Sequence, residues 1–105
     1  MYCVACPLLF FHMTNSIFKV YIHGGGLAGG RSSGETPYYL MDYPDSEKIV
    51  FVAMNYRLGS LGFLTLKSDT GEYLSGNQGF RDQAMALQWV QDNIGQFGGN
   101  KDQVV

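Results

Sequence analysis

Residues 17–26 have the sequence IFKVYIHGGG, and this stretch decides the fold. Its first part, 17–22, is rich in β-branched and aromatic residues, which predicts a strand that ends at His23. A glycine run directly after a strand leaves the backbone free in φ and free of side chains. The pattern therefore indicates a loop that brings its backbone close to a ligand at the end of a strand.

A second strand and a long helix follow. Residues 48–54, with the sequence KIVFVAM, are nearly continuously apolar, which is typical of a strand inside a parallel sheet covered by helices. A helix is predicted from about Gln78 to Phe97, because apolar residues recur there every three or four positions. They are Phe80, Ala84, Leu87, Val90, Ile94 and Phe97. Asn77 is the expected N-cap, and Gly98 is the expected left-handed residue after the helix.

A third strand is expected to begin at Val104-Val105, where the sequence stops. Strand, glycine loop, strand, helix and a further strand in this order imply a partial α/β fold with a parallel sheet. The connection at 24–47 is long for a compact domain and is therefore expected to be functional, with one short helical turn at 36–42. A sheet of so few strands is expected to leave a face or an edge uncovered.

The first sixteen residues differ in character from the rest. We interpret 1–16 as an atypical, poorly ordered N-terminus and 17–105 as the domain. The apolar run at 4–11 is far shorter than the roughly 20 residues that cross a bilayer, and it lacks the flanks of a signal peptide. Cys3 and Cys6 have a C-x-x-C spacing, but His12 alone does not complete a zinc site, so two free cysteines are the simpler interpretation.

Composition excludes several function classes. The chain has 105 residues, 46% of them hydrophobic, with a formal net charge of −2. It carries no basic patch, so no nucleic-acid partner is expected, and no transmembrane segment is predicted. Its nine acidic residues show no paired-carboxylate or metal-ligand spacing, so neither a metal nor another cofactor is expected.

The glycine run after His23 fits an oxyanion hole. An ester or amide hydrolase needs backbone N–H groups that point at the oxyanion of the tetrahedral intermediate. A loop of the HGGG type, here at 23–26, supplies half of that hole in α/β-hydrolases. The run is short, so it indicates this chemistry only moderately by itself.

The same glycines also match the dinucleotide-binding pattern G-x-G-x-x-G, at Gly24, Gly26 and Gly29. That pattern must open a helix, and an acidic residue should end the next strand. The sequence GRSSGETP at 30–37 would break such a helix, and the next strand ends in Asn55. Dinucleotide binding is therefore disfavoured.

Residues 30–34, GRSSG, match the nucleophile-elbow pattern G-x-S-x-G, with Ser32 as the nucleophile. The elbow requires a strand directly before the serine and a helix directly after it, whereas Ser32 is predicted in the middle of a loop. We therefore reject Ser32, and we interpret His23 as a packing group rather than a base. The residues alone give oxyanion donors but no nucleophile–base pair.

Longer strings then occur in a characteristic order. They are VYIHGGG at 20–26, NYRLGSLGFL at 55–64, GNQGFRDQ at 76–83, ALQWV at 86–90 and FGG at 97–99. In these strings the chain, from about 18 to 105, closely resembles the type-B carboxylesterase/cholinesterase family, as an internal piece from the N-terminal half. The resemblance implies an α/β-hydrolase fold and cleavage of a small-molecule carboxylic ester by a Ser–His–Glu or Ser–His–Asp triad.

The resemblance also assigns residues. It implies that Gly25 and Gly26 are the oxyanion donors, and that Leu27, where many relatives have an aromatic residue, lines the acyl side of the substrate pocket. The nucleophile would follow just beyond Val105 and the other triad members later, so no triad residue is expected here and the chain alone should be inactive. Secretion or an endomembrane lumen is common in the family. A non-catalytic adhesion branch is the alternative, which the intact glycine run mildly disfavours.

One contact is expected from the shared strings. Arg57 follows the second strand, and Asp82 lies in the first turn of the helix, where a carboxylate also suits the helix dipole. We expect these two side chains to form an ion pair that ties the strand end to the helix.

Overall fold

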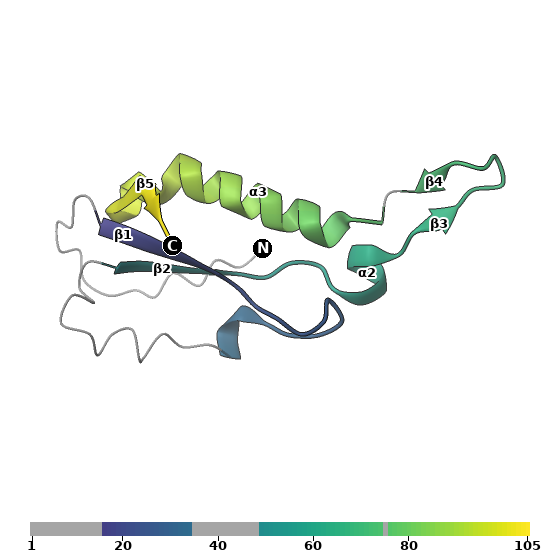
Figure 1. Ribbon diagram of the computed structural model, residues 1–105, viewed down its shortest axis with the longest axis horizontal. Helices are drawn as coiled ribbons and strands as arrows, with labels where there is room; N and C mark the ends of the chain where they lie inside the picture. The colour runs from purple at the N-terminus through teal and green to yellow at the C-terminus, as the bar shows by residue number, and fades with distance from the viewer. Residues whose placement is uncertain (1–15, 35–48, 75) are drawn as a thin grey trace.

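The computed structural model describes residues 16–34, 49–74 and 76–105 (Figure 1). In chain order its elements are β1 (Ser16–Ile22), the 3-10 turn η1 (Ser32–Gly34), β2 (Ile49–Met54), α2 (Gly59–Phe63), β3 (Leu66–Lys67), β4 (Tyr73–Leu74), α3 (Gln78–Asn93), the 3-10 turn η3 (Ile94–Phe97) and β5 (Gly99–Val104). The interpretations of Cys3, Cys6, the apolar run at 4–11 and the turn at 36–42 fall outside the described residues.

The main sheet has three parallel strands in the order β2-β1-β5. β1 and β2 pair without interruption from Ile17↔Ile49 to Ile22↔Met54. The chain moves from β1 to β2 on one side and then crosses through α3 to β5 on the other side. This arrangement confirms the α/β fold with a parallel sheet. It also places the carboxyl end of β1 at the point where the strand order reverses, which is where ligands bind in open α/β sheets.

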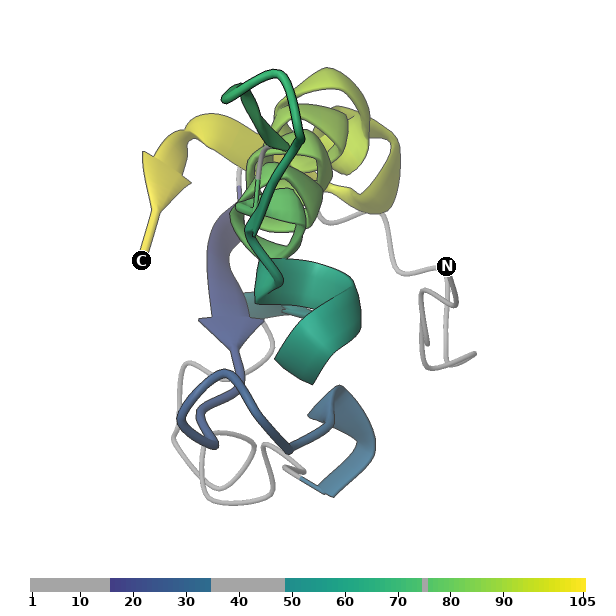
Figure 2. The same cartoon turned by 90° about the vertical axis from the view of Figure 1, so that its right-hand side faces the viewer.

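Helix α3 covers one face of the sheet (Figures 1 and 2). Val90 of α3 and Ile94, the first residue of η3, pack against Phe18 of β1, and these three are buried. The valines Val20, Val50 and Val52 surround them, because alternate residues of a strand point to the same face. Burying side chains of this size stabilises a fold by about 1.5–3 kcal/mol each, so this cluster is the main source of stability of the described part.

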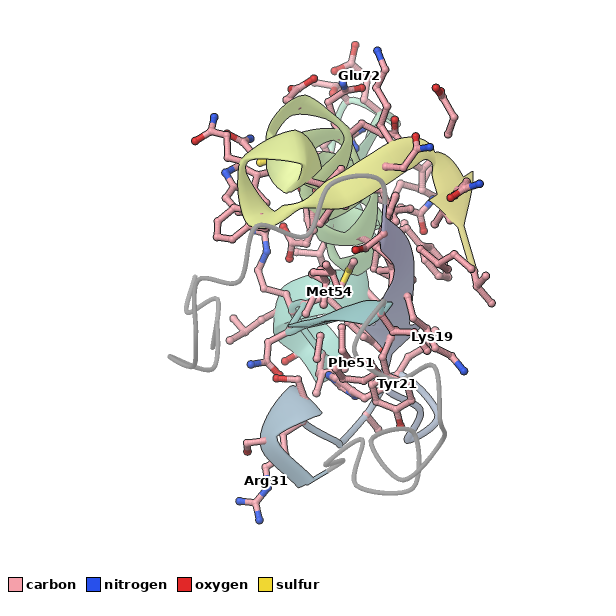
Figure 3. All side chains as sticks on the ribbon, turned by 90° about the vertical axis from the view of Figure 1, so that its left-hand side faces the viewer. Lys19, Tyr21, Arg31, Phe51, Met54 and Glu72 are labelled. Carbon is pink, nitrogen blue, oxygen red and sulfur yellow. The ribbon has the colours of Figure 1, made fainter. Side chains whose placement is uncertain are left out.

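The opposite face is more open. Tyr21 and Phe51 lie on the side of the sheet away from α3, with stacked rings whose centroids are 6.1 Å apart (Figure 3). Both side chains are half-buried, and Ile17 beside them is exposed. Within residues 16–34, 49–74 and 76–105, no α-helix packs on this face.

The helix predicted from about Gln78 to Phe97 is present, but it consists of two segments, α3 and η3. α3 ends at Asn93 and continues as the tighter turn η3 to Phe97, after which Gly98 has φ 81°, the left-handed conformation expected of it. Asn77 occupies the N-cap position, but its side chain makes no capping hydrogen bond; only its carbonyl accepts the N–H of Arg81, at 3.1 Å. The predicted N-cap position is confirmed, without a hydrogen bond from the Asn77 side chain.

The predicted apolar stripe of the helix is only partly buried. Of its members, Val90 and Ile94 are buried, whereas Phe80, Ala84, Leu87 and Phe97 are exposed. Ala86, which the stripe did not include, is buried instead of Ala84. Trp89, next to the stripe, is also exposed and packs beside Phe97 with ring centroids 6.1 Å apart. A sheet of three strands is too narrow to cover the whole stripe, which explains the difference.

Two strands differ from the sequence expectation. β5 begins at Gly99, earlier than the expected start at 104. Its residues are mostly polar, so they lack the composition of a buried strand, but they suit an exposed edge strand. The antiparallel pair β3–β4, which the sequence did not suggest, projects beyond the sheet (Figure 1). No helix within the described ranges is long and apolar enough to cross a membrane.

The core makes a testable prediction. Ile94 is 1% exposed and Met85, on the same helix, is 66% exposed. We expect Ile94→Ala to lower the free energy of unfolding by about 2–5 kcal/mol, because it removes buried methyl groups and leaves a cavity. Met85→Ala should change it by less than about 0.5 kcal/mol. Urea unfolding followed by the fluorescence of Trp89, the one tryptophan, measures both; equal effects would contradict the described core.

Candidate functional site

The glycine loop leaves the carboxyl end of the central strand β1 as a tight left-handed turn. Gly25, Gly26 and Leu27 have φ values of 120°, 62° and 62°. The carbonyl of Gly25 accepts the N–H groups of Ala28 and Gly29, at 3.2 and 3.1 Å, which closes the turn. A Cβ on Gly25 would collide with the carbonyl oxygen of Gly29. Position 25 therefore requires glycine both for its backbone angle and for space.

Leu27 is the one non-glycine residue of the described part with a positive φ. A left-handed conformation costs a residue with a side chain roughly 1–2 kcal/mol. The N–H of Gly59, at the start of α2, donates to the carbonyl of Leu27 at 2.7 Å and holds it there. Such enforced strain is concentrated at functional sites and ligand clamps.

The loop offers unpaired donors. Gly25 and Gly26 are exposed, and within the described ranges their N–H groups donate no hydrogen bond. Two adjacent free N–H groups on a glycine backbone can hold a single oxygen atom, because no side chain shields them. The arrangement is therefore suited to binding a carbonyl oxygen or an oxyanion.

A shallow, open depression of about 360 Å³ lies between the loop and α2. It is lined by Gly26, Leu27, Ala28, Gly59, Ser60, Phe63 and Leu64. Its volume is within the range of small-molecule sites, roughly 300–1,000 Å³, although it is far less enclosed than they are. Leu27 thus lines a hollow next to the donors, and its assignment to the acyl side stays a prediction.

His23 lies under the loop rather than in the depression. It is 4% exposed, and its ring stacks on Tyr56, with centroids 4.6 Å apart and an angle of 17° between the planes. Its Nδ1–H donates to the carbonyl of Gly24 at 2.9 Å, and the Tyr56 hydroxyl donates to the carbonyl of His23 at 2.8 Å. Its Nε2 has no hydrogen-bond partner among the described residues. These contacts suit a packing and orienting role, as expected, and not that of a base.

Ser32 does not occupy a nucleophile elbow. It begins η1, a single 3-10 turn, and no strand precedes it directly. The residue is 7% exposed, and its backbone N–H donates to Oδ1 of Asn55 at 2.9 Å. Within the described ranges its hydroxyl makes no hydrogen bond to a histidine or a carboxylate. The geometry supports the rejection of Ser32.

Arg57 and Asp82 form the expected ion pair. Nε and Nη2 of Arg57 donate to the two carboxylate oxygens at 2.7 Å each, and the backbone N–H of Arg57 adds a bond of 3.0 Å. The hydrogen bond from Arg57 lowers the pKa of the Asp82 carboxyl, and the same bond raises the pKa of Arg57. Two-point pairing fixes the orientation of both groups, so the pair joins the segment after β2 to α3. Asp82 lies just past the first turn of α3, so its expected place in that turn is wrong.

Glycines allow the same segment to pack closely. A Cβ on Gly62 or on Gly79 would collide with the carbonyl of Arg57 or the ring of Phe63. Neither this role of the GSLGF and GNQG strings nor the loop contacts of Asn55, Tyr56 and Gly59 was predicted from the sequence. The recurrence of glycine after the arginine and at the start of the helix was the one available indication. No three His, Cys, Asp or Glu side chains of the described part are grouped to hold a metal ion.

Comparison with known proteins agrees with this geometry. The model of the carboxylesterase family matches residues 15–105. Acetylcholinesterase of Electrophorus electricus is 48% identical over 90 residues, which are 86% of this chain and 14% of that protein. Pyrethroid hydrolase Ces2a of Mus musculus is 48% identical over 91 residues, 87% of this chain and 15% of its own length. Esterase E4 of Myzus persicae is 46% identical over 86 residues, 81% of this chain and 14% of its own.

A solved structure is similar as well. EstA of Aspergillus niger superimposes with a TM-score of 0.73 at 35% identity, over 89% of this chain and 18% of that one. The chain thus spans about one seventh of the length of the curated relatives named above. These matches cover the sheet, the glycine loop and the helices described here.

The ion pair predicts a pH dependence. Because the pKa of Asp82 is lower in the folded chain than in the unfolded one, the pair stabilises the fold above the unfolded pKa of about 3.9. That contribution is lost as the pH falls through the folded value. Asp82→Asn should therefore lower stability at pH 7, and its difference from the parent should shrink below about pH 4.

Urea midpoints between pH 2.5 and pH 7 measure this difference. Asp92→Asn is the matched control, since it removes a carboxylate of the same helix that is bonded to the neutral amide of Gln88. A loss at pH 7 that is as large for Asp92→Asn as for Asp82→Asn would contradict the role of the ion pair.

The position of Ser32 predicts an absence of activity. The chain by itself should hydrolyse a simple aryl ester no faster than its Ser32→Ala variant, because this serine has neither an elbow nor a base. Release of the phenol is followed by absorbance. Stoichiometric labelling of Ser32 by a serine-directed organophosphate, located by mass spectrometry, would show the interpretation to be wrong.

Proposed function

The chain belongs to the carboxylesterase family, and on this premise we propose that it supplies the oxyanion-hole part of a carboxylic ester hydrolase. One observation carries the proposal. The backbone N–H groups of Gly25 and Gly26, which donate no hydrogen bond within the described ranges, lie in a strained glycine turn at the carboxyl end of the central strand.

The chemistry follows from these donors. When a nucleophile adds to the carbonyl carbon of an ester, the carbonyl oxygen becomes an oxyanion. Preformed N–H groups stabilise this charge more strongly than they bind the neutral ester, and therefore they raise the rate of the chemical step. Leu27, next to the donors, would contact the acyl group of the ester as part of the depression.

The nucleophile itself is proposed to come from the chain after β5. β5 is parallel to β1 and pairs with it, so both carboxyl ends lie at the same edge of the sheet. A serine on a turn that follows β5 would thus approach the glycine loop. The resemblance to the family implies such a turn just after Val105, with a third oxyanion N–H from the residue after the serine.

The relatives support the class of reaction more than a particular substrate. Their names include an acetylcholinesterase, a pyrethroid hydrolase and a fumonisin B1 esterase, the last from Sphingopyxis macrogoltabida and 41% identical over 88 residues. These names refer to very different esters. We therefore propose small-molecule carboxylic esters as the substrate class.

The glycine loop also speaks against a purely adhesive role. An adhesion domain needs the fold, but it does not need exposed N–H donors. A left-handed Leu27 would also have no function in such a domain. Glycine at position 25 is required for a geometry that serves an oxyanion. An ester hydrolase accounts for these features together.

A chimeric enzyme tests the proposal. Residues of this chain would replace the matching 86-residue segment of esterase E4, which supplies the rest of the enzyme. We expect the chimera to hydrolyse an aryl ester, and Gly25→Ala to lower kcat by roughly 10²–10³-fold with little change in KM. Gly95→Ala, whose Cβ would enter open space far from the loop, should keep the activity.

The outcomes separate the two functions. An active chimera that tolerates Gly25→Ala would reject the oxyanion role of the loop. A chimera that folds, as judged by circular dichroism, and yet hydrolyses no ester would favour the non-catalytic branch of the family.

A further inference from the structure

We infer that His23 and Tyr56 form a positioning pair that fixes the direction of the oxyanion donors. The inference rests on the proposed function of the loop and names residues through which that function is maintained. Neither side chain would touch the substrate; each would act on the orientation of a peptide group.

The planar peptide group couples each carbonyl to the N–H that follows it. In a trans peptide the C=O of one residue and the N–H of the next point in opposite directions, and the described chain contains no cis peptide. Whatever holds the carbonyl of Gly24 therefore also aims the N–H of Gly25. In the same way, whatever holds the carbonyl of Gly25 aims the N–H of Gly26.

Both carbonyls are held. The Gly25 carbonyl accepts two N–H groups from within the turn, those of Ala28 and Gly29. The Gly24 carbonyl accepts the Nδ1–H of His23 at 2.9 Å. The first restraint is local to the loop backbone, whereas the second depends on a side chain that must itself be held in place.

Tyr56 holds that side chain. Its ring stacks on the imidazole at 4.6 Å, and its hydroxyl donates to the His23 carbonyl at 2.8 Å. Both residues are buried, so these contacts are protected from exchange with water. Tyr56 thus restrains the imidazole through its ring and the backbone of His23 through its hydroxyl.

The segment that carries Tyr56 is fixed on both sides. Before Tyr56, Oδ1 of Asn55 accepts the N–H of Ser32 at 2.9 Å, and Ser32 lies past the end of the glycine turn. After Tyr56, the N–H of Gly59 donates to the carbonyl of Leu27 at 2.7 Å. Arg57 is tied to α3 by the ion pair with Asp82. The restraint on Gly25 therefore passes from the helix through this segment to His23.

Tyr56→Phe in the chimera tests the inference, because it keeps the ring and removes the hydroxyl. We expect kcat to fall roughly tenfold, which is the effect of one hydrogen bond, while KM changes less than about twofold. The affinity for a trifluoromethyl ketone, a mimic of the tetrahedral intermediate, should fall by the same factor as kcat/KM. Tyr73→Phe, on the exposed hairpin strand β4, is the matched control and should change none of these values.

Combination with Gly25→Ala separates the two proposals. If Tyr56 acts through the loop, its substitution should have little further effect once Gly25→Ala has disrupted that loop. No loss from Gly25→Ala alone would refute the proposed function. A loss from Gly25→Ala without one from Tyr56→Phe, or equal effects of Tyr56→Phe in both backgrounds, would overturn the positioning pair and leave the function standing.

Should the chimera prove insoluble, amide hydrogen exchange on the 105-residue chain decides the question. Tyr56→Phe should speed exchange at Ala28 and Gly29, the amides that close the turn, and leave the amides of α3 unchanged. Equal exchange in the two chains, or amides at 28 and 29 that are already unprotected in the parent, would overturn the inference.

Discussion

The parallel pairing of β1 with β2 is the constraint on which the site depends. In this register Ile22 lies opposite Met54, so the residues that follow each strand, His23 and Asn55, leave the sheet side by side. The two connections then run next to each other, and three hydrogen bonds join them. A shift of β2 by one residue would also turn Val50 and Val52 away from α3, so the packing of the core favours the alignment of the site.

Several hydrogen bonds offset the free-energy cost of the strained backbone in the glycine turn. Leu27 is held by Gly59, and the turn is closed through the carbonyl of Gly25. Hydrogen bonds of this kind contribute about 0.5–1.5 kcal/mol each, so two or three of them suffice to offset a left-handed leucine. The loop can therefore keep its donors unpaired without support from a bound ligand.

The sequence predicted the elements whose information is local. The β-branched run at 17–22, the apolar run at 49–54 and the left-handed Gly98 depend on composition and on nearest neighbours along the chain, and they appear where expected. The exposure of Trp89 and Leu87 was not predictable in this way, because periodicity identifies an apolar face but not the width of the sheet that covers it. β5 was placed too late for a related reason: an edge strand can be polar.

The residues of the site can be separated in the same way, into those predicted from local sequence and those that depend on long-range contacts. Gly25 and Gly26 could be proposed from a glycine run after a strand, and the Arg57–Asp82 pair from strings shared with a family. The contacts of Tyr56 and Asn55 with the loop could not, since each spans more than twenty residues and depends on the register of two strands. Asn and Tyr are common residues after a strand, so their type and position do not predict a role. Their contacts are visible only in the folded structure.

The contacts that hold the glycine loop do not involve the chain after β5. The restraints on the two proposed donors all come from residues 23–59, and the anchor for those restraints comes from α3. A nucleophile that follows β5 would enter on the opposite side of β1 and would make none of these contacts itself. The donor half and the nucleophile half are therefore linked only through the sheet: β1 carries the loop, and its neighbour β5 would carry the serine. In such an arrangement the spacing of adjacent strands, about 4.8 Å, sets how far apart the glycine loop and the connection after β5 leave the sheet.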